Sequence, residues 1–236
     1  MSFSDLLKFG NRRPDEPRRS SVGDAPAPKG AEPVIASKAL QKFTGALSNR
    51  ESPVLVDFGP VIGANVAFFG EHLGCKLTIE DLASELDKHT RAGTRDVLGE
   101  ALAKRFTQAN ESVDGVLCWD LFDYLDKASA EALARKLVRI VREDGLVLAF
   151  FNTVDPKPGT EPPPPGYTKY VITDPVSLQH RPYAGVRSRQ KSFQNRDIQR
   201  MFEPMRITDQ FLLKSRTREV LFRKAAGDSP ASPPVP

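Results

Sequence analysis

Uninterrupted apolar runs of strand length constrain this chain more than any other feature. Three of them, VLVDFG (54–59), GVLCWDL (115–121) and LVLAFFN (146–152), lack the polar alternation of a strand with one face in water. Such runs are typical of strands buried on both faces. Segments of helical spacing separate the runs, most clearly in residues 128–142, where Ser129 is expected to cap a helix. Buried strands that alternate with helices predict an α/β fold built on a parallel sheet.

Further elements are expected on either side of these runs. CKLTIED (75–81) is predicted to be another strand, and residues 82–104 a helix interrupted near Gly93. YTKYVITD (167–174) is expected to be an added strand. Near the C-terminus, ITDQFLLKS and TREVLFRK flank a tight turn, which predicts an antiparallel strand pair closing one edge of the sheet.

Composition divides the chain into three parts. Residues 1–33 form an N-terminal segment that is rich in Pro, Arg, Ser, Ala and Gly from residue 10 onward, and residues 226–236 end in SPASPPVP. Neither segment can bury enough apolar surface to offset the entropy of ordering, so both are predicted to be disordered around a folded domain of residues 34–225. Within the first segment, Phe3, Leu6 and Leu7 fit one face of a helical turn, which is either a docking segment for a protein partner or a frayed terminus.

The overall composition excludes some classes of protein. No apolar stretch approaches the ~20 residues that a membrane span needs. The N-terminus has its basic residues after the apolar ones and no signal-peptide core, so we expect a cytoplasmic protein. Cys75 and Cys118 lie in apolar stretches and are expected to be buried and reduced. The three histidines have no metal-ligand spacing, and no metal site is expected.

A basic stretch, HRPYAGVRSRQKSFQNRDIQR (180–200), contributes to the formal charge of +4. It interleaves cations with Tyr183 and Phe193 and is either a surface for an acidic ligand or a solvated face. No RNA- or DNA-binding motif accompanies it, so nucleic acid is not an expected partner.

Candidate ligand-binding residues follow the strands, because open parallel sheets bind ligands beyond the carboxyl ends of strands. The first strand ends in Asp57 and Gly59, and Gly63 opens a helix whose N-terminus favours negative groups. Asp57 and Gly59 have a simpler reading as the end of a strand and its turn. The next strand ends in Glu80 and Asp81, which suit the hydroxyls of a ribose or else cap the following helix.

Trp119 and Asp120 end the strand of residues 115–121 and are expected beside the same crevice. Trp119 is equally well explained as a packing residue. Taken together, the residues at the strand ends resemble the class I S-adenosylmethionine-dependent methyltransferases over residues 34–225. An acidic residue followed by glycines maps onto Asp57, Gly59 and Gly63, and the acidic residue of the second strand maps onto Glu80. The fingerprint GxGxxG of dehydrogenases is absent.

This resemblance implies a Rossmann-like, doubly wound, mostly parallel sheet with a C-terminal antiparallel strand pair. It implies S-adenosylmethionine as the cofactor, with Asp57 near the amino end of the methionine moiety. Glu80 would bind the ribose, Trp119 and Asp120 would line the methionine side, and Gln108 or Asn110 would neighbour the adenine.

The sequence departs from the family pattern at the first turn. Val61 replaces the middle glycine, so a branched side chain is expected where backbone usually meets the cofactor. Pro60 stiffens the turn and removes one N–H donor. The aspartate that the family often has after the third strand is missing, since only Gln108 and Asn110 lie nearby.

Two hypotheses about function follow. The first is an enzyme that transfers a methyl group from S-adenosylmethionine to a small molecule, a reaction in which positioning supplies much of the catalysis. The second is a methyltransferase-like binding or regulatory protein without catalysis. Four side chains are candidates for a general base, and no pattern selects among them: Asp120, Tyr124, His180 and Tyr183.

Overall fold

The computed structural model describes residues 33–94, 97–155, 167–183 and 192–226. The predicted docking segment around Phe3 lies outside these residues, as do nearly all of the two predicted tails, so those expectations stay predictions. Within the described residues no helix is long and apolar enough to cross a membrane.

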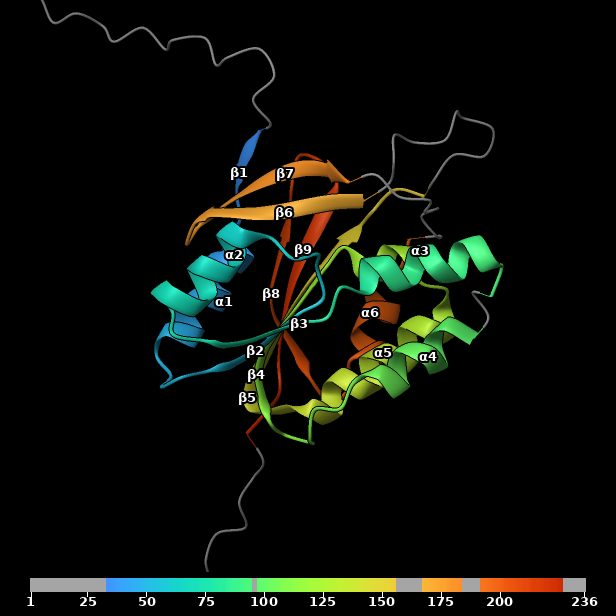
Figure 1. The fold of residues 1–236 in the computed structure, drawn as a ribbon, viewed down its shortest axis with the longest axis horizontal. Coiled ribbons are helices and arrows are strands. Elements are labelled where there is room, and N and C mark those ends of the chain that lie inside the picture. The colour runs from blue at the N-terminus through green and yellow to red at the C-terminus, as the bar shows by residue number, and fades with distance from the viewer. Residues whose placement is uncertain (1–32, 95–96, 156–166, 184–191, 227–236) are drawn as a thin grey trace, which may run out of the picture. The chain divides into compact units, whose positions relative to one another are not determined.

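The described strands form a central six-stranded sheet in the order β3-β2-β4-β5-β9-β8 (Figure 1). The first four pair in parallel, and β9 is antiparallel to both β5 and β8. This arrangement confirms the predicted α/β, Rossmann-like, mostly parallel sheet with its C-terminal antiparallel pair. The strand bounds are β2 Val54–Asp57, β3 Lys76–Ile79, β4 Val113–Trp119, β5 Val141–Asn152, β8 Arg206–Leu212 and β9 Thr217–Arg223.

Helices cover both faces of this sheet (Figure 1). One face packs against α1 (Lys38–Ser48), α2 (Gly63–Ala67) and the π-helical turn η1 (Phe68–His72) that continues α2. The other face packs against α3 (Leu82–Ala92), α4 (Leu98–Arg105), α5 (Lys127–Ile140) and α6 (Asn195–Met201). A 3-10 turn, η3 (Leu121–Tyr124), links β4 to α5.

Local sequence explains where these helices begin and end. In α5 the buried residues Ala130, Leu133, Leu137 and others recur at helical spacing. The expected cap at Ser129 is wrong: Asp126 is the N-cap, and its carboxylate accepts hydrogen bonds from the backbone N–H and hydroxyl of Ser129. The interruption near Gly93 is confirmed, since Gly93 has a φ of 67° and ends α3.

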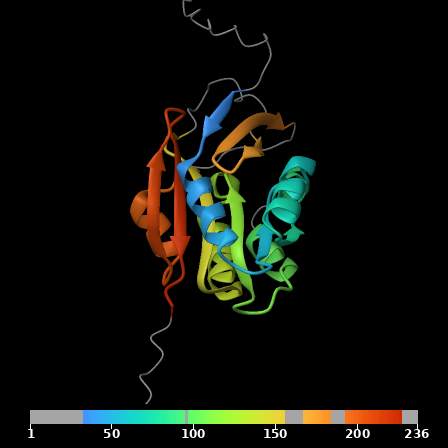
Figure 2. The same ribbon diagram turned by 90° about the vertical axis from the view of Figure 1, so that its left-hand side faces the viewer.

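A second sheet of three described strands stands apart from the first. It has the order β1-β7-β6, with β1 Val34–Ala36, β7 Ser177–Tyr183 and β6 Tyr167–Asp174, and every pairing is antiparallel. We call it the cap sheet, because it lies across the carboxyl ends of the parallel strands (Figures 1 and 2). Residues 167–174 are therefore a strand, as predicted, but they belong to this separate sheet.

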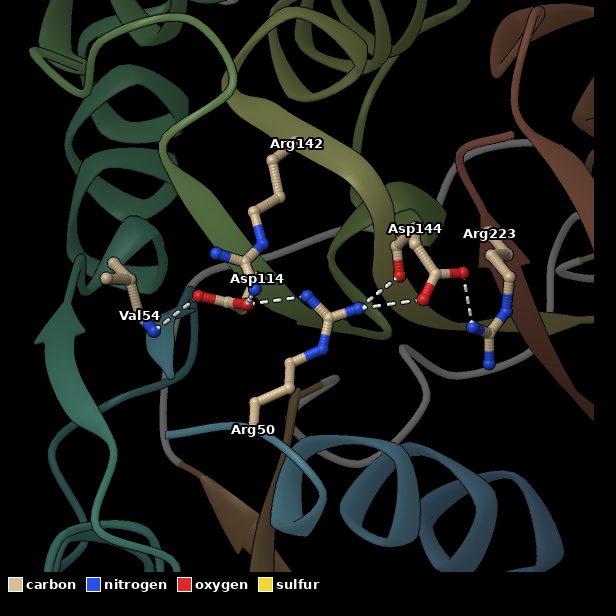
Figure 3. A network of polar contacts seen from close by, with 6 residues as sticks. All are labelled: Arg50, Val54, Asp114, Arg142, Asp144 and Arg223. Carbon is tan, nitrogen blue, oxygen red and sulfur yellow. Dashed lines mark hydrogen bonds and ion pairs between the residues drawn. The ribbon is translucent and has the colours of Figure 1, made fainter. Parts of the chain in front are cut away.

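A network of ion pairs between side chains lies at the amino ends of the parallel strands (Figure 3). The buried carboxylate of Asp114 in β4 accepts from Arg50 at 2.6 Å, from Arg142 at 2.5 Å and from the backbone N–H of Val54 at 2.8 Å. The second acid, Asp144, accepts from Arg223 at 2.6 Å and pairs with Arg50 at 3.3 Å. The network ties the beginnings of β2, β4 and β5 to the end of the antiparallel β9.

Candidate functional site

The crevice expected to bind a ligand lies between β2 and β4. From β2 the sheet extends to β3 on one side and through β4 to β5 on the other, so the strand order reverses between β2 and β4. Asp57 ends β2, Trp119 ends β4, and Asp57 pairs with Leu117 in the ladder between them. The structure therefore brings together two of the residues that the sequence selected.

The side chain of Trp119 fills this crevice. Its indole Nε1 donates a hydrogen bond to Oδ1 of Asp57 at 2.6 Å, and the same oxygen accepts from the backbone N–H of Gly59 at 2.8 Å. Both side chains are almost fully buried, with 2% of Trp119 and 1% of Asp57 exposed. A Cβ atom on Gly59 would come within 2.8 Å of Nε1. Gly59 thus leaves room for the indole at the place where a cofactor would approach the backbone.

Aromatic rings hold the indole from the side of the cap sheet. The ring of Tyr170 in β6 stacks on Trp119 with centroids 5.2 Å apart and planes 7° apart. Phe150 meets both rings edge-on, at 5.8 Å from Trp119 and 5.1 Å from Tyr170. Such pairs add about 0.5–1.5 kcal/mol each beyond the area that they bury. The cap sheet therefore contributes directly to the burial of Trp119.

The backbone of Trp119 is unusual. Its φ is 50°, in the left-handed region that a bulky side chain rarely adopts. The β4–β5 register also shifts between Leu117 and Trp119, which marks a bulge at the end of the strand. Bulges are common beside functional sites, where they change the direction of a side chain. The indole reaches Asp57 at the cost of local backbone strain.

Burial raises the pKa of the Asp57 carboxyl from 3.8 to about 6, and the hydrogen bonds from Gly59 and Trp119 only partly oppose this rise. No cation is among the causes of the shift. The site is thus a low-dielectric pocket in which a neutral N–H donor satisfies the acid.

The two acids that follow β3 have partners of their own. Glu80 accepts from Nε of Arg105 at 2.9 Å, and Arg105 also pairs with Glu85 at 3.4 Å. Asp81 caps α3, with its carboxylate accepting from the backbone N–H of Ser84 at 3.2 Å and from the Ser84 hydroxyl at 2.9 Å. The helix-capping interpretation of Asp81 therefore has a geometric basis, and its role toward a cofactor stays a prediction.

The turn residues lie apart from the indole. Val61 is 68% exposed. Gly63 begins α2, and a Cβ there would meet no atom within 4 Å. The expected obstacle to a cofactor at Val61 stays a prediction, and the indole of Trp119 next to Gly59 is a second obstacle.

The remaining predicted site residues do not gather at one place. Asp120 is buried, and its Oδ2 accepts from the hydroxyl of Tyr124 across a long 3.5 Å. His180 packs edge-on against Tyr170 at 4.9 Å, and burial lowers its pKa below 6.5. Asn110 accepts from Arg139 at 3.4 Å on the surface. Tyr183 is the last residue of β7. No single one of the four candidate bases is selected by this arrangement.

Sequence reasoning missed the residues that shape the crevice. Tyr170 and Arg105 come from elements far along the chain from Asp57, and no local motif marks either of them. Asn65 was missed as well, although a buried asparagine within an apolar helix turn is a recognisable signal of a specific hydrogen-bonding role.

A separate cavity of about 370 Å³ opens between the N-terminal ends of α5 and α6, with Leu125, Lys127, Phe193 and Asp197 in its wall. It contains none of the predicted cofactor residues. Among the described residues, no three His, Cys, Asp or Glu side chains gather as a metal site would require.

In the arrangement described, groups that the resemblance assigns to S-adenosylmethionine make contacts within the protein. The space next to Gly59 holds the indole, the carboxylate of Asp57 accepts from Trp119, and the carboxylate of Glu80 accepts from Arg105. S-adenosylmethionine bound as the resemblance implies would approach Gly59, so the indole would have to leave that space first.

Comparisons with known proteins give likenesses of fold alone. No protein-family model and no curated protein matches this chain. Among solved structures, a 1,6-didemethyltoxoflavin-N1-methyltransferase of Burkholderia thailandensis, with bound 1,6-didemethyltoxoflavin and S-adenosylhomocysteine, is 14% identical with a TM-score of 0.44 over 80% of each chain.

A putative type 11 methyltransferase of Sulfolobus solfataricus is 14% identical with a TM-score of 0.40, covering 80% of this chain and 90% of the other. The [4+2]-cyclase SpnF is 11% identical with a TM-score of 0.44, covering 79% and 81%.

Proposed function

We propose that this chain is a methyltransferase-fold binding or regulatory protein that does not transfer methyl groups. The observation that carries the proposal is the indole of Trp119, which fills the crevice between β2 and β4 and donates to Asp57 at 2.6 Å. Fold alone does not decide function, so the contents of the site have to. In this structure the chain's own side chains occupy the site.

The pairing of Glu80 with Arg105 supports the same proposal. An acid that binds ribose hydroxyls has to present its oxygens to the crevice, whereas one oxygen of Glu80 accepts from the guanidinium at 2.9 Å. The pair is partly exposed, so its energy is small. It nevertheless gives one oxygen of Glu80 a partner within the protein.

A second candidate is an S-adenosylmethionine-dependent methyltransferase that acts on a small molecule in the cytoplasm. It is favoured by the position of Asp57, Gly59 and Glu80 at or just beyond the carboxyl ends of adjacent parallel strands. The thiols of Cys75 and Cys118, both buried and free, suit a reducing compartment for either candidate. When bound, the cofactor would supply a methyl group on a sulfonium.

Calorimetric titration of the full-length protein with S-adenosylmethionine and S-adenosylhomocysteine separates the two candidates. We expect no saturable heat up to millimolar ligand, which corresponds to a binding free energy weaker than about −4 kcal/mol. The exposed substitution Leu212→Ala serves as a control for protein handling. Saturable micromolar binding by the wild type would overturn the proposal, because the crevice would then admit the cofactor.

A further inference from the structure

One buried side chain joins the cap sheet to the helix that follows the first strand. Asn65 in α2 is 2% exposed. Its Nδ2 donates to the backbone oxygen of Tyr170 at 2.9 Å, and the backbone N–H of Ile172 donates to its Oδ1 at 2.8 Å. The amide of Asn65 therefore makes the same pair of hydrogen bonds with β6 that a neighbouring strand would make.

This pairing provides hydrogen-bond partners for backbone groups on the outer side of β6. In the cap sheet β6 is an edge strand with β7 on one side only, so its other side presents unpaired backbone groups. Asn65 satisfies two of those groups, on either side of Val171. A buried amide without these partners would be left with unsatisfied polar groups, so the contact fixes both the position and the register of β6.

The other end of the cap sheet is attached to α1. The backbone N–H of Ser37 donates to the oxygen of Val176 at 2.8 Å, and the hydroxyl of Thr44 donates to the oxygen of Pro175 at 3.3 Å. Pro175 and Val176 form the turn between β6 and β7. The cap sheet thus has polar attachments at its turn and at Asn65, in addition to the core packing of Tyr170, Ile172 and Leu178 and the direct continuation of β1 into α1.

We propose that the cap sheet is a self-inhibitory latch, in which Asn65 fastens β6 so that Tyr170 keeps the indole of Trp119 in the crevice. Release of Asn65 frees β6 while the turn stays attached to α1, and Tyr170 then leaves the face of the indole. This inference rests on the proposed function, because it explains how the crevice is kept filled.

The backbone strain at Trp119 favours movement of the indole out of the crevice once the latch is released. A φ of 50° is unfavourable for a tryptophan, so surrounding contacts have to hold the residue there. Of those contacts, the stacked ring of Tyr170 is carried by the cap sheet and the hydrogen bond to Asp57 by the central sheet. If the contact with Tyr170 is lost, fewer contacts hold the strained backbone of Trp119 in place. The indole then becomes more accessible to solvent.

Trp119 is the only tryptophan in the sequence, so its fluorescence reports on the latch without a label. The test variant is Asn65→Asp, which is nearly isosteric and loses the donor to Tyr170. The matched control is Asn110→Asp, the same change at an exposed position. Acrylamide quenching and the emission maximum are measured for both variants and the wild type, together with hydrogen exchange of the backbone amides.

In Asn65→Asp we expect a several-fold rise in quenching, a red-shifted emission and faster exchange in β6 and β7, with β4 and β5 as protected as in the wild type. Asn110→Asp should match the wild type. An indole that stays shielded in Asn65→Asp would overturn the latch. Loss of protection in β4 and β5 to the same extent would also overturn it, because the change would then be global unfolding.

A measurement on the wild type covers the case in which Asn65→Asp does not fold. The amide of Ile172 should exchange through a local opening that costs less free energy than the opening of the β5 amides. Exchange of Ile172 only through global unfolding would sink the proposal. Titration with S-adenosylhomocysteine is read separately: binding by the wild type refutes the proposed function, whereas the latch is decided by quenching and exchange.

Discussion

Nε1 of Trp119 lies 2.6 Å from Oδ1 of Asp57, so a side chain from the end of β4 satisfies the acid at the end of β2. This hydrogen bond crosses the point of the sheet where strand order reverses and where ligands of open α/β sheets bind. The resemblance assigns Asp57 to a cofactor, but in this structure its carboxylate is part of the protein's own packing.

The pH dependence of stability should reveal the burial of Asp57. Its pKa is raised to about 6 in the folded protein, so the folded state holds the proton more tightly than the unfolded state does. The stability that Asp57 contributes is full below pH 4 and is lost as the pH rises to about 6, a change of roughly 3 kcal/mol. Urea unfolding of the wild type and Asp57→Asn at several pH values measures it.

Other titrating groups, including Glu219 with its raised pKa, are common to both proteins and cancel in the comparison. As the pH rises from 4 to 7, the unfolding free energy of the wild type should therefore fall relative to that of Asp57→Asn. A difference that stays constant over this range would show that Asp57 titrates normally.

Substitutions at Trp119 should separate packing from backbone strain. Trp119→Ala is expected to lower the free energy of unfolding by about 3–5 kcal/mol, since it empties a buried aromatic site. Trp119→Gly should cost about 1 kcal/mol less, because glycine adopts a φ of 50° without strain. Chemical unfolding followed by circular dichroism measures both. A glycine variant less stable than the alanine variant would contradict the strain at this residue.

The ion network at the amino ends should be important for stability and irrelevant to the crevice. Asp114→Ala is expected to cost about 3–5 kcal/mol, because it leaves Arg50, with only 13% of its side chain exposed, without its buried partner. Arg142→Ala removes a 45%-exposed partner of the same acid and should cost about 1 kcal/mol or less. Thermal unfolding of the two variants provides the comparison, and equal losses would argue against a buried role for Asp114.

Glu80→Ala tests the ribose role directly. Because Glu80 pairs with Arg105 in a partly exposed site, the substitution should change the free energy of unfolding by less than about 1 kcal/mol. Titration with S-adenosylhomocysteine should show no binding before or after the change, and Arg105→Ala is the matched control. Binding by the wild type that weakens by about 1–3 kcal/mol in Glu80→Ala would instead assign the ribose to this acid.

The fold could be predicted well because its signals are local. The runs at 54–59, 115–121 and 146–152 form β2, β4 and most of β5, and the turn near residue 214 joins the predicted antiparallel pair. Burial on both faces removes polar alternation from a strand, and such a pattern is visible in six or seven residues.

The contents of the site could not be predicted, because they depend on contacts between distant segments. Trp119 meets Tyr170 across 51 positions of sequence, and Arg105 reaches Glu80 across 25. The strand of residues 167–174 was expected, but its place in a separate sheet follows from its pairing with β7 and from Asn65.

Gly59 shows that a glycine after the first strand can persist for two unlike reasons. In one protein it admits a ligand to the backbone, and in this one it admits an indole from the neighbouring strand. In this structure the group that lies against Gly59 is the side chain of residue 119. A glycine after the first strand therefore does not by itself identify a ligand site.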